Sequence, residues 1–168
     1  IGIPDKVLEV IRPTRFANGP ALWLDAYPWP QSADHKYSRG HAVIAGGGKM
    51  TGAARLAARG AMRSGAGIAT VASPPEAMQI YAADMAGVLV TAVANASEFA
   101  ALLEDPRKNA VLIGPGCGVN RTTREMVLAA LAGDRSVILD ADALTVFGDD
   151  PDRLFAATAG RNCLLTPH

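Results

Sequence analysis

The sequence predicts an α/β fold, a mostly parallel sheet with helices on both faces. From His41 onward, short apolar runs alternate with alanine-rich segments of helical length, which is the pattern of successive strand–helix units. The apolar runs have no polar side, as strands covered on both faces require. With 168 residues, 49% of them hydrophobic, the chain is long enough to bury one core.

We expect six strands and six helical segments after residue 40. The strands are expected near Ala42–Ala45, Ile68–Ala72, Val88–Ala92, Ala110–Ile113, Ser136–Leu139 and Asn162–Leu165. The helices are expected near Thr51–Ser64, Pro75–Ala83, Ser97–Leu103 and Arg121–Leu131, with a short one after Asp142 and another near Pro151–Ala156. Asn120 is the expected N-cap of the fourth helix, because its side chain can accept a backbone N–H of the first turn.

The first forty residues are expected to be irregular. They contain Pro4, Pro13, Pro20, Pro28 and Pro30, and prolines at this density suppress regular hydrogen-bonded structure. We therefore interpret the segment before residue 35 as a linker.

The composition argues against several classes of protein. The 16 basic and 16 acidic residues balance, so no bulk charge attracts nucleic acid or an anionic membrane. No apolar run has the length of a membrane span, and the N-terminus lacks the pattern of a signal peptide, which predicts a cytoplasmic protein. Cys117 and Cys163 have no metal-ligand spacing and are expected to be reduced and buried. Partners are therefore expected to be small molecules that bind in a pocket.

Three loops that follow predicted strands contain unusual residues. These are Gly46–Gly52, Gly114–Gly118 and Asp140–Asp142. In open parallel sheets, ligands bind at the carboxyl ends of the strands, where such loops converge. All three loops are expected at that edge.

The two glycine-rich loops have different interpretations. Gly46–Gly52 is not a P-loop, because Met50 follows Gly48-Lys49, and Thr51 breaks the Rossmann spacing. It either offers backbone N–H groups to an anion or ligand, or makes a tight turn for helix packing. Gly114–Gly118 contains more glycines than a simple turn needs, which favours a loop that faces a ligand.

The candidate polar site residues are Asp140, Asp142 and His168. One Asp suffices to cap the following short helix, so the second suggests a polar substrate or a metal–water cluster. His168 follows the last apolar run, where a lone His is either a surface residue or part of a site. Cys117 has no partner His or Asp at a recognisable spacing and is interpreted as a small filler rather than a nucleophile.

Four blocks in order resemble the dehydratase domain that repairs hydrated nicotinamide cofactors, within the ribokinase-like superfamily. They are His35–His41 leading into Val43–Gly47, Thr51–Ala54 through Arg63–Gly67, Ile113–Gly118, and Leu139–Leu144 with Leu165–His168. Together they span roughly residues 35 to 168. A single block of this kind is weak evidence, whereas four in the right order are specific.

The resemblance implies a domain organisation and a set of contacts. Residues 35–168 are the N-terminal part of the dehydratase domain, and residues 1–34 are a linker with the end of a preceding epimerase domain, whose closing strand is similar to Ile1–Pro4. The implied contacts with hydrated NAD(P)H come from Ala53, the turn from Gly116 to Gly118, and His168, while Asp140 and Asp142 border the pocket. A homo-oligomer is also expected.

The reaction implied by the resemblance is that of a carbon–oxygen lyase. ADP or ATP phosphorylates the extra hydroxyl of the hydrated nicotinamide ring, and elimination of phosphate restores NAD(P)H, with Mg²⁺ neutralising phosphate charge. The family's nucleotide segment and its Gly-x-Gly-Asp base do not occur in this sequence, so the general base is expected beyond His168. The chain is therefore expected to be a fragment that is inactive alone.

Two other functions stay open at this point. A kinase for a small alcohol, such as a sugar or a thiazole, is possible on the same scaffold, because fold does not fix function. A non-catalytic nucleotide-binding module is the alternative from another class. The His-Lys-x-x-x-Gly motif at His35–Gly40 and the Thr-Pro-His at 166–168 favour the dehydratase.

Overall fold

The computed structural model describes residues 2–167, and the chain divides into two compact units, Ile1–Ser32 and Ala33–His168. The first unit contains the helix α1 (Asp5–Ile11) and the 3-10 turns η1 (Pro20–Leu22) and η2 (Leu24–Ala26). The expectation that this segment is wholly irregular was wrong. Asp5 lies in the first turn of α1, directly after Pro4, and the helix ends at Ile11, before Arg12, which adopts a left-handed conformation and is followed by Pro13. This order of residues is a helix start and stop signal.

The assignment of the first residues to an epimerase domain stays a prediction. Residues 2–4 carry no regular secondary structure, and Ile1 lies outside the described residues. The strand expected there is thus absent from residues 2–4.

The second unit contains a six-stranded, all-parallel sheet in the order β3-β2-β1-β4-β5-β6. The strands are β1 (His41–Ala45), β2 (Ile68–Ser73), β3 (Leu89–Ala92), β4 (Ala110–Ile113), β5 (Ser136–Asp140) and β6 (Cys163–Thr166). The helices are α2 (Gly52–Arg63), η3 (Pro75–Ala77), α3 (Met78–Ala82), α4 (Ala96–Leu102), α5 (Arg121–Ala132), α6 (Asp142–Thr145) and α7 (Pro151–Thr158). Each expected strand and helix after residue 40 is present within one or two residues of its expected ends.

The chain enters the sheet at a central strand, β1, and adds strands first on one side and then on the other. The chain passes from β1 outward through β2 to β3, returns to β4 on the other side of β1, and continues outward to β5 and β6. The strand order therefore reverses between β1 and β4. In an open parallel sheet, this switch point is where loops diverge and leave room for a ligand at the carboxyl ends.

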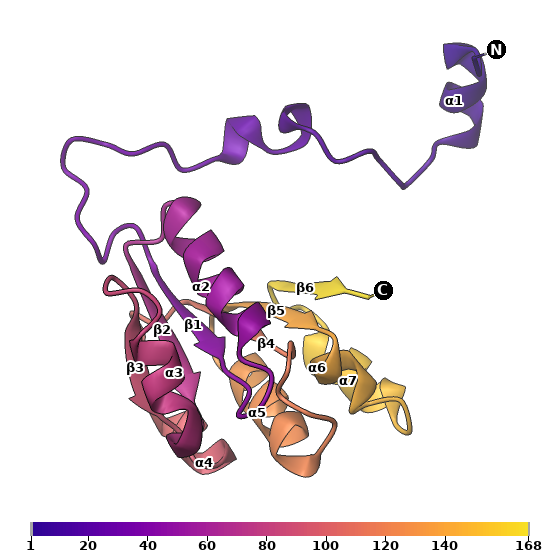
Figure 1. Ribbon diagram of the computed structural model, residues 1–168. Coiled ribbons are helices and arrows are strands. Elements are labelled where there is room, and N and C mark those ends of the chain that lie inside the picture. Colours follow the sequence, from indigo (N-terminus) through magenta and orange to yellow (C-terminus); the bar gives the residue numbers. More distant parts are fainter. Residues whose placement is uncertain (1, 168) are drawn as a thin grey trace. The chain divides into compact units, whose positions relative to one another are not determined.

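Helices lie on both faces of the sheet, as predicted (Figure 1). On one face, α2 and α3 enclose a core that includes Ile44, Val71 and Tyr81. On the other face, α4 to α7 enclose a larger core, which includes Phe99 and Phe147. The alternation of side chains along each strand sends one set to each core.

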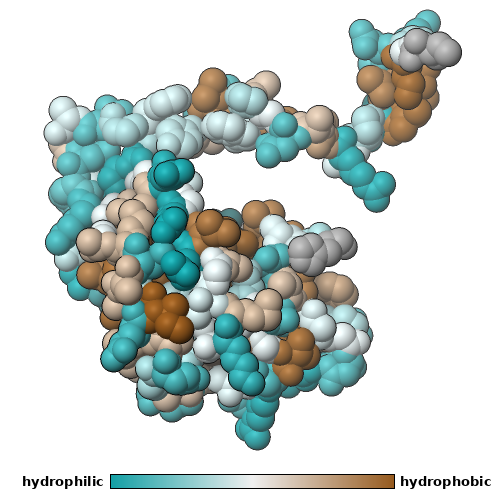
Figure 2. All heavy atoms as spheres, in the orientation of Figure 1, coloured by the Kyte–Doolittle hydropathy of each residue, from teal (hydrophilic) through white to brown (hydrophobic). Residues whose placement is uncertain are grey.

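The face that carries α2 and α3 is not covered over its full width. Ile44, Leu112, Ile138 and Leu164 pair in register across four neighbouring strands. Along this row Ile44 is 1% exposed, Ile138 36% and Leu164 57%. Brown apolar atoms lie between α2 and β6 in Figure 2. The expectation that every strand is covered on both faces was therefore wrong for β5 and β6, because α2 and α3 pack on β1, β2 and β3.

No helix among the described residues is long and apolar enough to span a membrane.

Candidate functional site

The two glycine loops meet main chain to main chain at the switch point. A Cβ on Gly47 would lie 1.9 Å from the carbonyl oxygen of Gly116, and a Cβ on Gly116 would lie 2.4 Å from that of Met50. Neither position has room for a side chain. The packing interpretation of the Gly46–Gly52 loop therefore accounts for Gly47, and the same contact holds the turn at Gly116 in place.

Tyr81 of α3 packs against the Gly46–Gly52 loop and bonds to it. Its hydroxyl donates a hydrogen bond to the carbonyl oxygen of Gly47 at 2.8 Å, and a Cβ on Gly46 would lie 2.9 Å from its ring. Burial of the side chain raises the pKa of Tyr81, so the hydroxyl stays protonated and able to donate. Sequence reasoning missed this residue, because a Tyr on an amphipathic helix carries no signal that distinguishes it from ordinary core.

The Gly114–Gly118 turn requires glycine at three positions. Gly114, Gly116 and Gly118 have φ values of +134°, +75° and +85°, a region that residues with a Cβ rarely adopt. A Cβ on Gly114 would also lie 1.6 Å from the carbonyl oxygen of Asp140. The expected need for a permissive backbone is confirmed, and the turn is held against the end of β5.

The two carboxylates form separate hydrogen bonds, one to the turn after β4 and one to strand β6. The Oδ2 atom of Asp142 accepts the backbone N–H of Gly118 at 2.8 Å, and the Oδ1 atom of Asp140 accepts the hydroxyl of Thr166 at 2.9 Å. Ala141 between them has φ +44° and ψ −116°, a strained conformation for a residue with a Cβ.

Neither the metal nor the capping interpretation of Asp140 and Asp142 gains support. Among the described residues, no group of three or more His, Cys, Asp or Glu side chains is placed to hold a metal ion. The residue before α6 is Ala141, and no side chain caps this helix. The carboxylates instead bond to neighbouring segments, Asp142 to the turn after β4 and Asp140 to β6.

Ala53 lies in the first turn of α2 and is exposed. Met50, three residues before it, contacts Gly116. The described structure thus brings the start of α2, the Gly116–Gly118 turn and the two carboxylates to one edge of the sheet, and the contacts of these residues with a substrate stay a prediction. His168 lies outside the described residues.

Cys117 is a partly buried thiol rather than a nucleophile. Burial raises its pKa to about 11, with a smaller contribution from the nearby charge of Asp142. Its sulfur lies 3.7 Å from the carbonyl oxygen of Ala45, and its own carbonyl accepts the hydroxyl of Thr123. At neutral pH almost no thiolate is present, which agrees with the interpretation of Cys117 as a filler.

A cavity of about 280 Å³ lies behind the two glycine loops. Its polar lining includes the carboxylate of Glu76 and the N-caps of two helices, Asn95 for α4 and Asn120 for α5. Asn120 accepts the N–H of Thr123 at 3.0 Å, so its predicted capping role is confirmed. This cavity offers room for a ligand group next to the turn.

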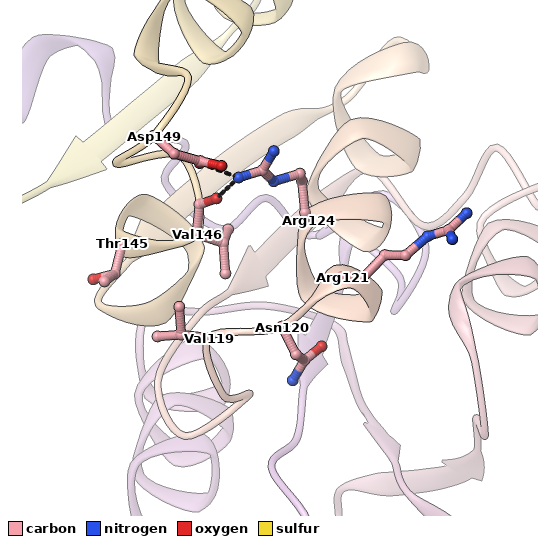
Figure 3. A pocket seen from close by; sticks show the side chains of 7 residues that line it. All are labelled: Val119, Asn120, Arg121, Arg124, Thr145, Val146 and Asp149. Atoms are coloured by element: carbon pink, nitrogen blue, oxygen red, sulfur yellow. Dashed lines mark hydrogen bonds and ion pairs between the residues drawn. The ribbon is translucent and has the colours of Figure 1, made fainter.

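A second cavity, of about 470 Å³, lies between α5 and the end of α6. Figure 3 shows Arg124 reaching across it to the carbonyl oxygen of Val146 and the carboxylate of Asp149, while Arg121 points away. The guanidinium of Arg124 also lies over the Phe147 ring. These contacts link α5 to the end of α6. Because the charge of Arg124 is already paired with Asp149, Arg124 is a poor candidate for binding an anion.

The His35–Gly40 motif lies at the opposite, amino-terminal edge of the sheet. The Nδ1 atom of His35 accepts the N–H of Ser38 at 3.1 Å, and Arg39 donates to the carbonyl oxygen of Gly65 at 3.1 Å. A Cβ on Gly67 would lie 1.8 Å from the carbonyl oxygen of Lys36. The motif thus holds the segment before β1 against the turn before β2. It stabilises the fold and does not lie at the edge with the glycine loops.

The six parallel strands, the switch point and the converging glycine loops define an open, parallel α/β protein with its loops gathered at one edge of the sheet. The sequence profile of the NAD(P)H-hydrate dehydratase family matches residues 41–168. The chain therefore belongs to this family.

Individual relatives agree with this assignment. The chain is 35% identical over 150 residues to the bifunctional NAD(P)H-hydrate repair enzyme of Coxiella burnetii, a match that covers 87% of the chain and 29% of the relative. It is 33% identical over 182 residues to the enzyme of the same description from Pyrobaculum aerophilum, covering 100% and 32%. The chain thus spans about a third of the length of these curated relatives.

Solved structures show the same fold. A ribokinase-like superfamily protein from Enterococcus faecalis superposes with a TM-score of 0.69 at 26% identity, over 83% of this chain and 49% of that one. The ADP/ATP-dependent NAD(P)H-hydrate dehydratase from Bacillus subtilis, co-crystallised with ATP and Mg²⁺, superposes with a TM-score of 0.61 at 31% identity, over 70% and 42%.

Proposed function

We propose that this chain binds hydrated NAD(P)H at the carboxyl edge of its sheet and acts in the ADP- or ATP-dependent dehydration of that substrate, a carbon–oxygen lyase reaction. Membership of the dehydratase family supports the proposal. The observation that carries it is the convergence of the Gly116–Gly118 turn, the start of α2 and the Asp140–Asp142 segment at the β1/β4 switch point. Ligands of open parallel sheets bind at such an edge.

Each proposed residue has a role that follows from its place. The turn from Gly116 to Gly118 is partly exposed and has no side chain at either end, so a dinucleotide can approach its main chain closely. Ala53 has a small side chain at the N-terminal turn of a twelve-residue helix, where backbone N–H groups are free to meet polar ligand atoms. We propose that His168 completes this edge at the end of β6.

We propose that groups other than the described residues hold the nucleotide and Mg²⁺. The relative from Bacillus subtilis was crystallised with ATP and Mg²⁺. Among the described residues no group of three or more His, Cys, Asp or Glu side chains is placed to hold a metal ion, so they do not fit a Mg²⁺ site by themselves. When bound, the nucleotide supplies the phosphoryl group. The part of this chain is to bind and orient the hydrated ring.

The test is an isothermal calorimetric titration of the chain with hydrated NADH and with hydrated NADPH. Ala53→Glu places a long charged side chain at the proposed edge and should weaken binding at least tenfold. Ala101→Glu is the matched control, because Ala101 is an exposed residue of α4. It should bind like the wild type.

Two results would argue against the proposal. The first is no binding by the wild-type chain, and the second is equal binding by Ala53→Glu and the wild type. Binding of a sugar or thiazole alcohol in place of the hydrated cofactor would instead favour the small-alcohol kinase. Binding of ATP alone would favour the non-catalytic nucleotide-binding module.

A further inference from the structure

The side chain of Asp142 forms a hydrogen bond with the main chain of Gly118. Its Oδ2 atom accepts the N–H of Gly118 at 2.8 Å, and Gly118 has φ +85°. Without this bond, a glycine in such a conformation has many alternatives, because it lacks the Cβ that would restrict it. A charge-assisted hydrogen bond to the backbone is among the stronger ways to select one of them.

The rest of the segment fixes where Asp142 sits. Gly114, at the start of the turn, approaches the carbonyl of Asp140 too closely for any side chain. Ala141 adopts its strained conformation directly between the two carboxylates. Strain of this kind persists only where the surroundings over-determine the backbone, and it concentrates at ligand-binding sites. Here it lets Asp140 contact β6 while Asp142 contacts the turn after β4.

We propose that Asp142 is a positioning residue, which sets the geometry of the Gly116–Gly118 turn through the Gly118 N–H and does not bind the substrate directly. The inference rests on the proposed function, in which this turn contacts hydrated NAD(P)H. It assigns the carboxylate a role that the spacing of Asp140 and Asp142 left open between capping, a metal cluster and substrate contact.

The first measurement does not depend on any ligand. In a chain labelled with ¹⁵N-glycine, hydrogen exchange of the Gly118 amide should speed up at least tenfold in Asp142→Ala, while the amides of Gly60 and Gly133 keep their wild-type rates. Asp142→Asn retains an acceptor oxygen of the same size and should restore most of the protection. Glu104→Ala, which removes an exposed carboxylate elsewhere, is the control. Unchanged exchange at Gly118 in Asp142→Ala would overturn the proposal.

The second measurement separates positioning from direct contact. Asp142→Ala should weaken binding of hydrated NADPH about tenfold, and Asp142→Asn should recover most of that loss. If Asp142→Asn keeps Gly118 protected yet binds as weakly as Asp142→Ala, the carboxylate charge contacts the substrate and the proposal is wrong. If the wild type binds no hydrate while the exchange result holds, the proposed function fails and the positioning of the turn by Asp142 stands.

Discussion

Gly47 and Gly116 contact each other through their main chains, with 1.9 Å between the place of a Gly47 Cβ and the Gly116 carbonyl oxygen. This contact joins the loop after β1 to the loop after β4 across the switch point of the sheet. The two loops therefore form one surface, and a change at either residue displaces both.

Gly47→Ala should lower the free energy of unfolding by about 1–3 kcal/mol, the usual cost of forcing extra atoms into a packed site. Gly60→Ala is the matched control, because nothing lies within 4 Å of its Cβ position in the exposed middle of α2. It should instead stabilise the protein by roughly 0.5–1 kcal/mol, since alanine favours a helix over glycine. Urea unfolding followed by circular dichroism measures both, and destabilisation by both variants would contradict the packing argument.

Tyr81→Phe should cost about 1 kcal/mol of unfolding free energy, because the carbonyl of Gly47 loses its buried donor while the ring still fills its place. The same variant should loosen the Gly46–Gly52 loop, with faster hydrogen exchange there than in the strands. An unfolding free energy equal to that of the wild type would mean that water replaces the hydroxyl without loss.

Stability should fall as the pH drops below about 6.5, and His41 should contribute to that fall. Burial lowers the pKa of His41, the charges of Lys108 and Arg107 lower it further, and Asp105 partly opposes them. In the unfolded chain the imidazole keeps its ordinary pKa of about 6.5. Between the two pKa values the unfolded state binds more protons, so its population grows as the pH decreases. The His41 contribution is complete above pH 6.5 and is lost as the pH falls toward the folded-state pKa.

His41→Asn tests this contribution, because asparagine can still hydrogen-bond near Thr70, the partner of the His41 Nε2 atom at 2.7 Å, but does not titrate. Unfolding free energies between pH 5 and pH 8 should vary less in the variant than in the wild type. The same pH dependence in both proteins would show that other groups cause it.

The exposed apolar row on β5 and β6 predicts self-association of this chain. Ile138 and Leu164 lie side by side on the open face, and Leu56 of α2 is 68% exposed. Contiguous apolar surface of this kind marks a contact site. Light scattering should detect oligomers in the wild type and fewer in Leu164→Lys. The control Phe155→Lys, which changes an exposed side chain of α7 on the opposite face, should leave the oligomers unchanged.

Most of the second unit could be predicted from the sequence, because its strands are continuous apolar runs, its helices lie in alanine-rich segments between them, and α5 begins at a recognisable cap, Asn120. The meeting of the three loops followed from the rule that parallel strands end at one edge. The contact of Gly47 with Gly116 and the bond from Asp142 to Gly118 could not be predicted, since they depend on distances between residues far apart in the chain. That the open face lies over β5 and β6 could not be predicted, because Ile138 and Leu164 are as apolar as covered residues.

Because helices cover only one face of β5, neighbouring positions of this strand tolerate different substitutions. Val137 and Leu139 point into the larger core and are almost fully buried, whereas Ile138 between them is 36% exposed. Polar replacements at 137 and 139 place unpaired groups in a dry interior, whereas at 138 the same replacements keep their contact with water. A library of variants selected for folding alone should therefore keep apolar residues at 137 and 139 and accept polar ones at 138. If a library selected for function also rejects polar residues at 138, the extra constraint comes from a binding partner rather than from the fold.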